Sequence, residues 1–212
     1  MAIGIVAAVI FAVLAGTQIF HVAQMRAKPS GGVAEPHFTL TAADGRTVTE
    51  QDFRGKFLVV YFGYTFCPDV CPTNLNAIAA GLDKLGGKAD LVVPVFVSVD
   101  PARDTPEKLS AYVAQFSPHM LGLSGTPEQV KAAATQFGAV YSRVEGDGEF
   151  YSVDHSADTY VVGPDGVRLE TLAHGFTPER LAAVLSQRIS SSALSMPPAK
   201  VEPSGSSQGE KQ

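Results

Sequence analysis

The sequence predicts an α/β domain in which helices flank a mixed central sheet. Strand-like and helix-like segments alternate along the chain, and a Pro-Gly turn joins the last two predicted strands as an antiparallel pair. Of the 212 residues, 45% are hydrophobic and 17% are charged. About 155 residues lie between two compositionally distinct ends. A domain of this size can form one hydrophobic core without disulfides or structural metals. The two cysteines are therefore available for chemistry.

The predicted strands are of two kinds. Continuous apolar runs, typical of central strands covered on both faces, occur at Phe57–Phe62 and Leu91–Val99. Two hairpins accompany them: Phe38–Leu40 with Arg46–Thr49 around Asp44-Gly45, and Thr159–Val162 with Val167–Leu172 around Gly163-Pro164-Asp165-Gly166. We expect the second hairpin at a sheet edge, preceded by a polar, hairpin-like insertion at Val140–Ser156.

Four helices separate these strands. Three begin where Thr can cap the helix and Pro fits its first turn: from Asp104 to about Phe116, from Thr126 to Gly138, and from Thr177 to about Ile189. The remaining helix, Pro72–Leu85, has apolar residues at helical spacing and directly follows the first apolar strand. This order resembles a thioredoxin-like fold, which keeps its chemistry in the loop where Cys67 lies.

The first 25 residues predict a single transmembrane anchor. They contain no Asp, Glu, Lys or Arg, and Ile3 to Phe20 is an almost unbroken apolar run that can cross the hydrocarbon core. A cleaved signal peptide is the alternative, with a small-residue site ending at Ala15. No basic residue precedes the run, and the run continues past Ala15, which favours the anchor.

The composition divides the rest of the chain into three parts. Residues 26–35 are rich in Gly and Pro and predict a linker, whereas residues 191–212 are rich in Ser, Pro and Gly and predict a disordered tail. The folded domain is then residues 36–190. The formal net charge is −5, and the chain has no basic run interleaved with aromatic residues, so we expect no nucleic-acid partner.

The two cysteines form the first candidate site. Cys67 and Cys71 are four residues apart, so a helix-like turn would place both side chains on one face. Pro72 suits the first helical position, which puts Cys71 at a helix entrance that favours thiolate. Low-pKa thiolates serve metal ligation and disulfide exchange, and a structural disulfide is a third reading. The pair alone does not decide between them.

The spacing favours a metal site. A redox dithiol of this fold usually has two residues between its cysteines, and here three intervene. Thiolate and imidazole ligands select Cu(I), with Zn and Fe–S as rivals, but a third ligand is needed. His155 is the best candidate because it lies just before the strand that adjoins the cysteine loop in this fold. Asp154 could orient its imidazole, although a solvated carboxylate is the simpler reading.

The other histidines lie in ordinary places. They are His21, in the apolar N-terminal segment, and His37, His119 and His174, near the ends of predicted strands or helices. Two further features are read as structural. Asp100-Pro101 and Arg103–Pro106 mark a strand end and a helix cap. The aromatic residues around the cysteines are expected in the core and the cleft wall: Tyr61, Phe62, Tyr64 and Phe66.

Three segments together resemble the Sco/SenC family. They are Tyr-Phe-Gly-Tyr-Thr-Phe-Cys-Pro-Asp-Val-Cys-Pro at 61–72, Val-Ser-Val-Asp-Pro at 97–101 with Arg-Asp-Thr-Pro at 103–106, and Val-Asp-His-Ser at 153–156. The resemblance extends from about Pro36 to Ile189. It implies a membrane-tethered copper chaperone, not an enzyme, that delivers Cu(I) or Cu(II) to the CuA site of cytochrome c oxidase. It also implies that Cys67, Cys71 and His155 are the copper ligands.

The resemblance implies partners and a location. The partners are the copper-site subunit of the oxidase, a copper-donor protein and a thioredoxin-like reductant. The domain is expected to face the periplasm from a bacterial inner membrane, or else the mitochondrial intermembrane space. The distribution of basic residues predicts the opposite orientation. Arg26 and Lys28 follow the apolar run, and the positive-inside rule would then keep the domain in the cytoplasm.

Two other functions use the same cysteines. A membrane-tethered thiol-disulfide oxidoreductase would use Cys67 and Cys71 as a redox disulfide that reduces the cysteines of the oxidase copper site. A peroxidase is disfavoured, because the peroxiredoxin pattern is Pro-x-x-x-Thr-x-x-Cys. Here Thr65 lies only two residues before Cys67, and no Pro occupies the upstream position of the pattern.

Overall fold

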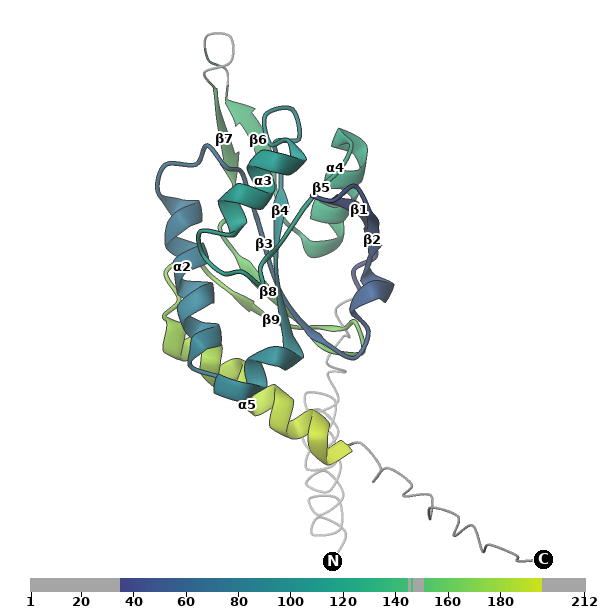
Figure 1. Cartoon of the computed structure of the whole chain (residues 1–212), viewed down its shortest axis with the longest axis vertical. Coiled ribbons are helices and arrows are strands. Elements are labelled where there is room, and N and C mark those ends of the chain that lie inside the picture. Colours follow the sequence, from purple (N-terminus) through teal and green to yellow (C-terminus); the bar gives the residue numbers. More distant parts are fainter. Residues whose placement is uncertain (1–34, 145, 147–150, 196–212) are drawn as a thin grey trace, which may run out of the picture.

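A seven-stranded mixed sheet forms the centre of the fold (Figure 1). The computed structural model describes residues 35–144, 146 and 151–195. Within these residues the sheet has the order β2-β1-β5-β4-β3-β8-β9. Its strands are β1 (Thr39–Ala42), β2 (Thr47–Thr49), β3 (Phe57–Gly63), β4 (Val92–Ser98), β5 (Leu121–Ser124), β8 (Thr159–Val162) and β9 (Arg168–Leu172). The predicted mixed sheet is confirmed.

Strand β3 lies deepest in the sheet. All seven of its residues are buried, as its continuous apolar sequence predicts. It pairs in parallel with β4, where Gly63 lies opposite Ser98, and antiparallel with β8, where Tyr61 lies opposite Thr159. The carboxyl ends of β3 and β4 therefore meet beside the start of β8. The loop that carries the cysteines leaves β3 at this point.

Helices flank the sheet. They are α2 (Val70–Asp83), α3 (Pro106–Val113), α4 (Pro127–Phe137) and α5 (Pro178–Ser195), with two short 3-10 helices, η1 (Glu50–Phe53) and η2 (Gly86–Leu91). The predicted Thr caps are present: the hydroxyls of Thr105, Thr126 and Thr177 accept from backbone amides three residues on, at 3.4, 3.3 and 3.2 Å. Gly138 ends α4 in the left-handed conformation, with φ of 72°.

Strand β5 was not predicted from the sequence. It is only four residues long, and Gly122 interrupts its apolar pattern. A Cβ at Gly122 would lie 2.7 Å from Leu109 of α3, so the close packing of α3 on this strand requires glycine. The glycine that this packing requires therefore also weakens the apolar pattern from which the strand could have been predicted.

The helix boundaries also differ from prediction. Helix α2 begins at Val70, so Pro72 lies inside its first turn, where a missing N–H is equally harmless, and Cys71 is helical. It ends at Asp83, before the glycines expected to end it. Helix α3 ends at Val113, short of Phe116, and α5 continues to Ser195, past Ile189.

The predicted insertion is a separate two-stranded sheet. Strands β6 (Tyr141–Val144) and β7 (Ser152–His155) pair antiparallel with Tyr141 opposite His155. The hairpin projects beyond the main sheet at the top of Figure 1. Its base is closed by Ser156, whose N–H donates to the Val140 carbonyl at 2.8 Å and whose hydroxyl accepts from the Val140 amide at 3.1 Å.

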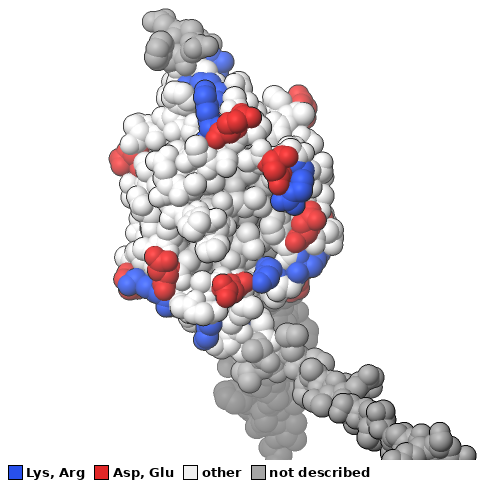
Figure 2. Space-filling view, in the orientation of Figure 1, with Lys and Arg blue, Asp and Glu red and all other residues white. Residues whose placement is uncertain are grey.

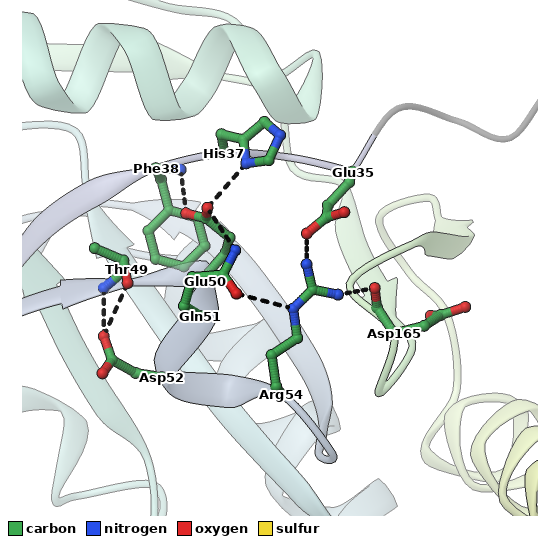
Figure 3. Close-up of polar contacts among 9 residues, drawn as sticks. All are labelled: Glu35, His37, Phe38, Thr49, Glu50, Gln51, Asp52, Arg54 and Asp165. Atoms are coloured by element: carbon green, nitrogen blue, oxygen red, sulfur yellow. Dashed lines mark hydrogen bonds and ion pairs between the residues drawn. The ribbon is translucent and has the colours of Figure 1, made fainter.

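Contacts near the start of the domain join the segment after η1 to the turn between β8 and β9 (Figure 3). Arg54 forms an ion pair with Glu35 and donates to the Asp165 carbonyl. The Gly55 amide donates to the Pro164 carbonyl at 2.9 Å. These contacts lie beside the start of β3, at the end of the sheet away from the cysteines.

The predicted anchor at residues 1–25 lies outside the described residues, as do nearly all of the linker at 26–35 and most of the tail at 191–212. In the described part of the chain, no helix combines the length and the apolar character needed to cross a membrane. Acidic and basic side chains are interspersed over the face shown in Figure 2.

Candidate metal centre

Three side chains with metal-binding atoms converge at the carboxyl end of β3. The sulfurs of Cys67 and Cys71 and a ring nitrogen of His155 all lie within 4.8 Å of one another. This is the one such group found among the described residues. Both cysteines are free thiols, and Cys71 Sγ lies 3.3 Å from His155 Nε2. The structure thus brings together the three residues that the sequence suggested as metal ligands.

The start of helix α2 fixes the two cysteines. The Cys67 amide donates to the Tyr64 carbonyl at 3.2 Å, which closes a turn directly after β3. The Cys71 amide, unpaired within the helix because it lies in the first turn, donates to Cys67 Sγ at 3.3 Å. The helix therefore stabilises negative charge on Cys67 and not, as predicted, on Cys71.

Gly63 makes the burial of Cys71 possible. A Cβ at this position would lie 2.6 Å from Cys71 Sγ and 2.9 Å from the ring of Phe96. Real Cβ atoms essentially never approach so closely, and Cys71 is fully buried at 0% exposure, so it has no room to retreat. The role of Gly63 was not predicted from the sequence, although a glycine that ends an apolar strand beside a cysteine motif was the available signal.

His155 reaches the cysteines from the β6–β7 hairpin. Its Nδ1 lies 3.1 Å from the Ser156 carbonyl, which can only accept, so Nδ1 carries a proton and Nε2 faces the cysteines. Tyr61 and Tyr64 contact the imidazole edge to face, with ring centroids 6.1 and 5.8 Å away. Asp154 is exposed, and the Ser156 carbonyl takes the orienting role suggested for it.

The remaining described histidines have other neighbours. His37 pairs with Glu50 at 2.8 Å on the surface (Figure 3). His174 contacts the Asn74 side chain at 3.0 Å, and His119 is exposed. His21 lies outside the described residues. The interpretation of His37, His119 and His174 as ordinary surface residues agrees with these positions.

The two thiols differ strongly in acidity. A hydrogen bond from Cys71 lowers the pKa of Cys67 to about 3, helped by hydrogen bonds from His155 and from the Cys71 amide and opposed by partial burial. The proton shared with Cys67, together with burial, raises the pKa of Cys71 above the usual thiol range. Burial and the nearby Cys71 sulfur also raise the pKa of Tyr61. The site therefore pairs the thiolate of Cys67, at 9% exposure, with the thiol of Cys71, at 0%.

Two buried polar residues near the site were not recognised as supports. Asn74 of α2 donates to the Ala157 carbonyl at 2.8 Å and so holds the segment after His155. Asp104 was expected only beside a helix cap, but it accepts from the amide and hydroxyl of Thr65 at 3.0 and 2.6 Å. The Ser98 hydroxyl also donates to it, at 2.6 Å. Asp104 thus fixes the start of the cysteine loop through its hydrogen bonds with Thr65.

This donor set suits a soft metal ion. A thiolate, a second thiol and an imidazole nitrogen favour Cu(I), and Zn(II) is the nearest rival. The aromatic rings of Tyr61 and Tyr64 are buried and form the inner wall of the site. Cys67, at 9% exposure, and Phe66, at 56%, form its outer edge.

Comparison with known proteins places these features in a family. A family model described as SCO1/SenC matches residues 26–190. SenC of Rhodobacter capsulatus is 45% identical over 146 residues, which cover 68% of this chain and 66% of that protein. The first relatives matched are longer, and this chain spans 42%, 56% and 58% of their lengths. The match thus covers the domain described above.

Solved structures share the fold. Arabidopsis thaliana ScoI with copper bound has a TM-score of 0.69 and 36% identity, over 73% of this chain and 97% of that one. BsSco is described as having a disulfide switch and as a member of the Sco family of cytochrome c oxidase assembly proteins. It has a TM-score of 0.58 and 26% identity, over 74% of this chain and 92% of that one.

The acidity of Cys67 predicts an unusual reactivity. In the reduced protein, the rate of Cys67 alkylation by iodoacetamide should stay nearly constant from pH 8 down to pH 5, because a group with pKa of about 3 remains thiolate there. An ordinary thiol slows about tenfold per pH unit over the same range. Mass spectrometry of the modified peptides would give the rates. Cys71, at 0% exposure, serves as the internal control and should remain unmodified.

A Cys67 rate that falls tenfold per unit would contradict the assigned polarity of the pair. The His155→Ala variant should lose part of the reactivity at pH 5 only, since the imidazole is one of the groups that lower the pKa.

Proposed function

Because the chain belongs to the SCO1/SenC family, we propose that it is a copper chaperone that delivers copper to the CuA site of cytochrome c oxidase. In this proposal Cys67, Cys71 and His155 hold the copper ion on a thioredoxin-like domain. The convergence of the three side chains within 4.8 Å carries the proposal. The copper-bound ScoI structure, at 36% identity, supports it.

The protonation states suit copper uptake. Cys67 is already a thiolate, and His155 Nε2 faces the site. Cys71 must give up its proton, so binding is expected to release about one proton per ion. Two sulfurs and one nitrogen form a three-coordinate set that suits Cu(I), and a fourth oxygen ligand would allow Cu(II). The buried tyrosine rings keep water from the inner side.

Delivery needs a docked acceptor and a tether. The acceptor in our proposal is the copper-site subunit of the oxidase, which would approach at the exposed Phe66, the neighbour of Cys67. The apolar segment 1–25 anchors the chain in a bacterial inner membrane with residues 36–190 in the periplasm, or in the mitochondrial counterpart. The segment 26–35 acts as the linker and the segment that follows α5 as a tail. A copper-donor protein and a thioredoxin-like reductant complete the cycle.

The proposal predicts stoichiometric copper binding. Anaerobic titration of the reduced protein with Cu(I), in competition with bicinchoninate, should give one ion per chain. Cys67→Ala, Cys71→Ala and His155→Ala should each weaken the affinity by at least about tenfold, or about 1.4 kcal/mol, because each removes one donor. His119→Ala is the matched control, an exposed histidine away from the site, and should bind as the unaltered protein does. Unchanged affinity in all three site variants would sink the proposal.

A second function, thiol-disulfide exchange, is favoured by the polarity of the cysteine pair. Cys67 can attack a target disulfide as the thiolate and expel one target sulfur, which takes up a proton. Cys71 then loses its proton and attacks the Cys67 sulfur, which releases the second target thiol. The target gains two electrons, and the chain retains a Cys67–Cys71 disulfide. The disulfide switch of BsSco supports this reading, in which the chain would reduce cysteines of the oxidase copper site.

This second function predicts exchange without the imidazole. At pH 7.5, His155→Ala should reduce a disulfide-bonded target peptide at nearly the unaltered rate, because Cys71 still holds Cys67 as thiolate. Cys67→Ser should abolish the reaction, and Cys71→Ser should stop it at the mixed disulfide. Thiol quantification over time would measure this. A rate no faster than that of free glutathione would rule the activity out.

A further inference from the structure

The histidine and the dithiol belong to different parts of the fold. The cysteines lie on the loop and helix that follow β3, whereas His155 ends β7 of the small β6–β7 sheet. Within the described residues, that sheet shares no hydrogen-bonded ladder with the seven-stranded sheet. The 3.3 Å approach of His155 Nε2 to Cys71 Sγ therefore depends on contacts that join the hairpin to the rest of the domain.

One of these contacts is made by the loop between β4 and α3. The Tyr151 hydroxyl donates to Asp100 at 2.6 Å, and an Arg103 guanidinium N–H donates to the Tyr151 carbonyl at 2.8 Å. Asp100 and Arg103 are also an ion pair, with side chains only 5% and 12% exposed. Tyr151 directly precedes β7, so this loop is hydrogen-bonded to the hairpin four residues before His155.

Arg103 also touches the cysteine loop. Its guanidinium carbon lies 3.5 Å from the ring centroid of Tyr151, 4.8 Å from that of Phe66 and 5.7 Å from that of Tyr64. Phe66 is next to Cys67, and Tyr64 packs edge to face on His155. One guanidinium thus lies between the two halves of the site, in cation–π contact with both.

The same loop holds the cysteine side independently. Asp104, the neighbour of Arg103, accepts both the amide and the hydroxyl of Thr65, two residues before Cys67. Asp104 is 2% exposed. The loop at 99–105 therefore contacts each half of the site through a different side chain. Because a buried ion pair is by itself weak evidence for a stabilising role, the contacts of the Asp100–Arg103 pair with the hairpin are the informative feature.

We propose that Arg103 and Asp100 are positioning residues that hold the β6–β7 hairpin so that His155 stays in reach of Cys67 and Cys71. The proposal rests on copper binding at these three residues, as proposed above. It assigns no metal contact to Arg103 or Asp100, whose effect acts entirely through His155. Removal of the Arg103 and Asp100 contacts should therefore affect copper binding as removal of the His155 imidazole does, with the two cysteines unchanged.

A double-mutant cycle tests this on the full chain. Arg103→Lys keeps the charge but loses the planar fork, and Tyr151→Phe keeps the ring but loses the bond to Asp100. Each should weaken Cu(I) affinity by about 10- to 100-fold in the unaltered background, the range for residues that orient ligands. In the His155→Ala background, neither should change the affinity by more than about twofold, since the positioned ligand is already gone. Arg103→Lys loaded with Cu(II) should also lose nitrogen hyperfine structure in its EPR spectrum.

Arg168→Lys is the matched control. Arg168 also donates to a backbone carbonyl, that of Phe137, and lies over a tyrosine ring, that of Tyr160, but on the β9 edge. The Arg168→Lys variant should bind Cu(I) as the unaltered protein does.

Two results would overturn the positioning role. One is an equal loss of affinity in the unaltered and the His155→Ala backgrounds, which would mean a general structural effect. The other is unchanged affinity in both Arg103→Lys and Tyr151→Phe. If His155→Ala itself leaves affinity unchanged, the proposed copper site fails instead, so the two failures are distinguishable.

Discussion

The close approach of Cys71 Sγ to His155 Nε2, at 3.3 Å, is the contact on which the site depends. It joins the first turn of α2 to the end of β7, two elements separated by 84 positions in the chain. Gly63 gives Cys71 its space at the end of β3. The parallel pairing of β3 with β4 brings the β4–α3 loop beside the cysteine loop, where it can hold both halves.

The same geometry produces the two candidate chemistries. A thiolate stabilised by a helix N-terminus and by a buried thiol is a good soft ligand and a good nucleophile. What distinguishes the two uses is the imidazole, because metal ligation needs a third donor and disulfide exchange does not. The two uses also exclude each other at any moment, since a Cys67–Cys71 disulfide leaves no thiolate for copper. A chain with both activities would alternate between them.

The sequence alone predicted features set by local chemistry. The buried strand β3, the Thr caps and the turn at Gly163–Gly166 follow from apolar runs, capping side chains and turn residues. Contacts between distant segments were less accessible. Strand β5 lacks an apolar pattern because Gly122 must admit Leu109, and Asp104 looked like part of a helix cap because its partner Thr65 lies 39 positions away. The anchor and tail lie outside the described residues and stay predictions.

X-ray absorption at the copper K-edge of the anaerobically loaded full chain tests the central claim most directly. The fine structure reports the number and kind of atoms bound to the metal, independently of affinity. If Cys67, Cys71 and His155 hold the ion as proposed, the first shell will contain two sulfurs and one imidazole nitrogen, with the outer-shell scattering of the ring. A shell of sulfur alone, or one unchanged in the His155→Ala variant, would contradict the three-ligand site.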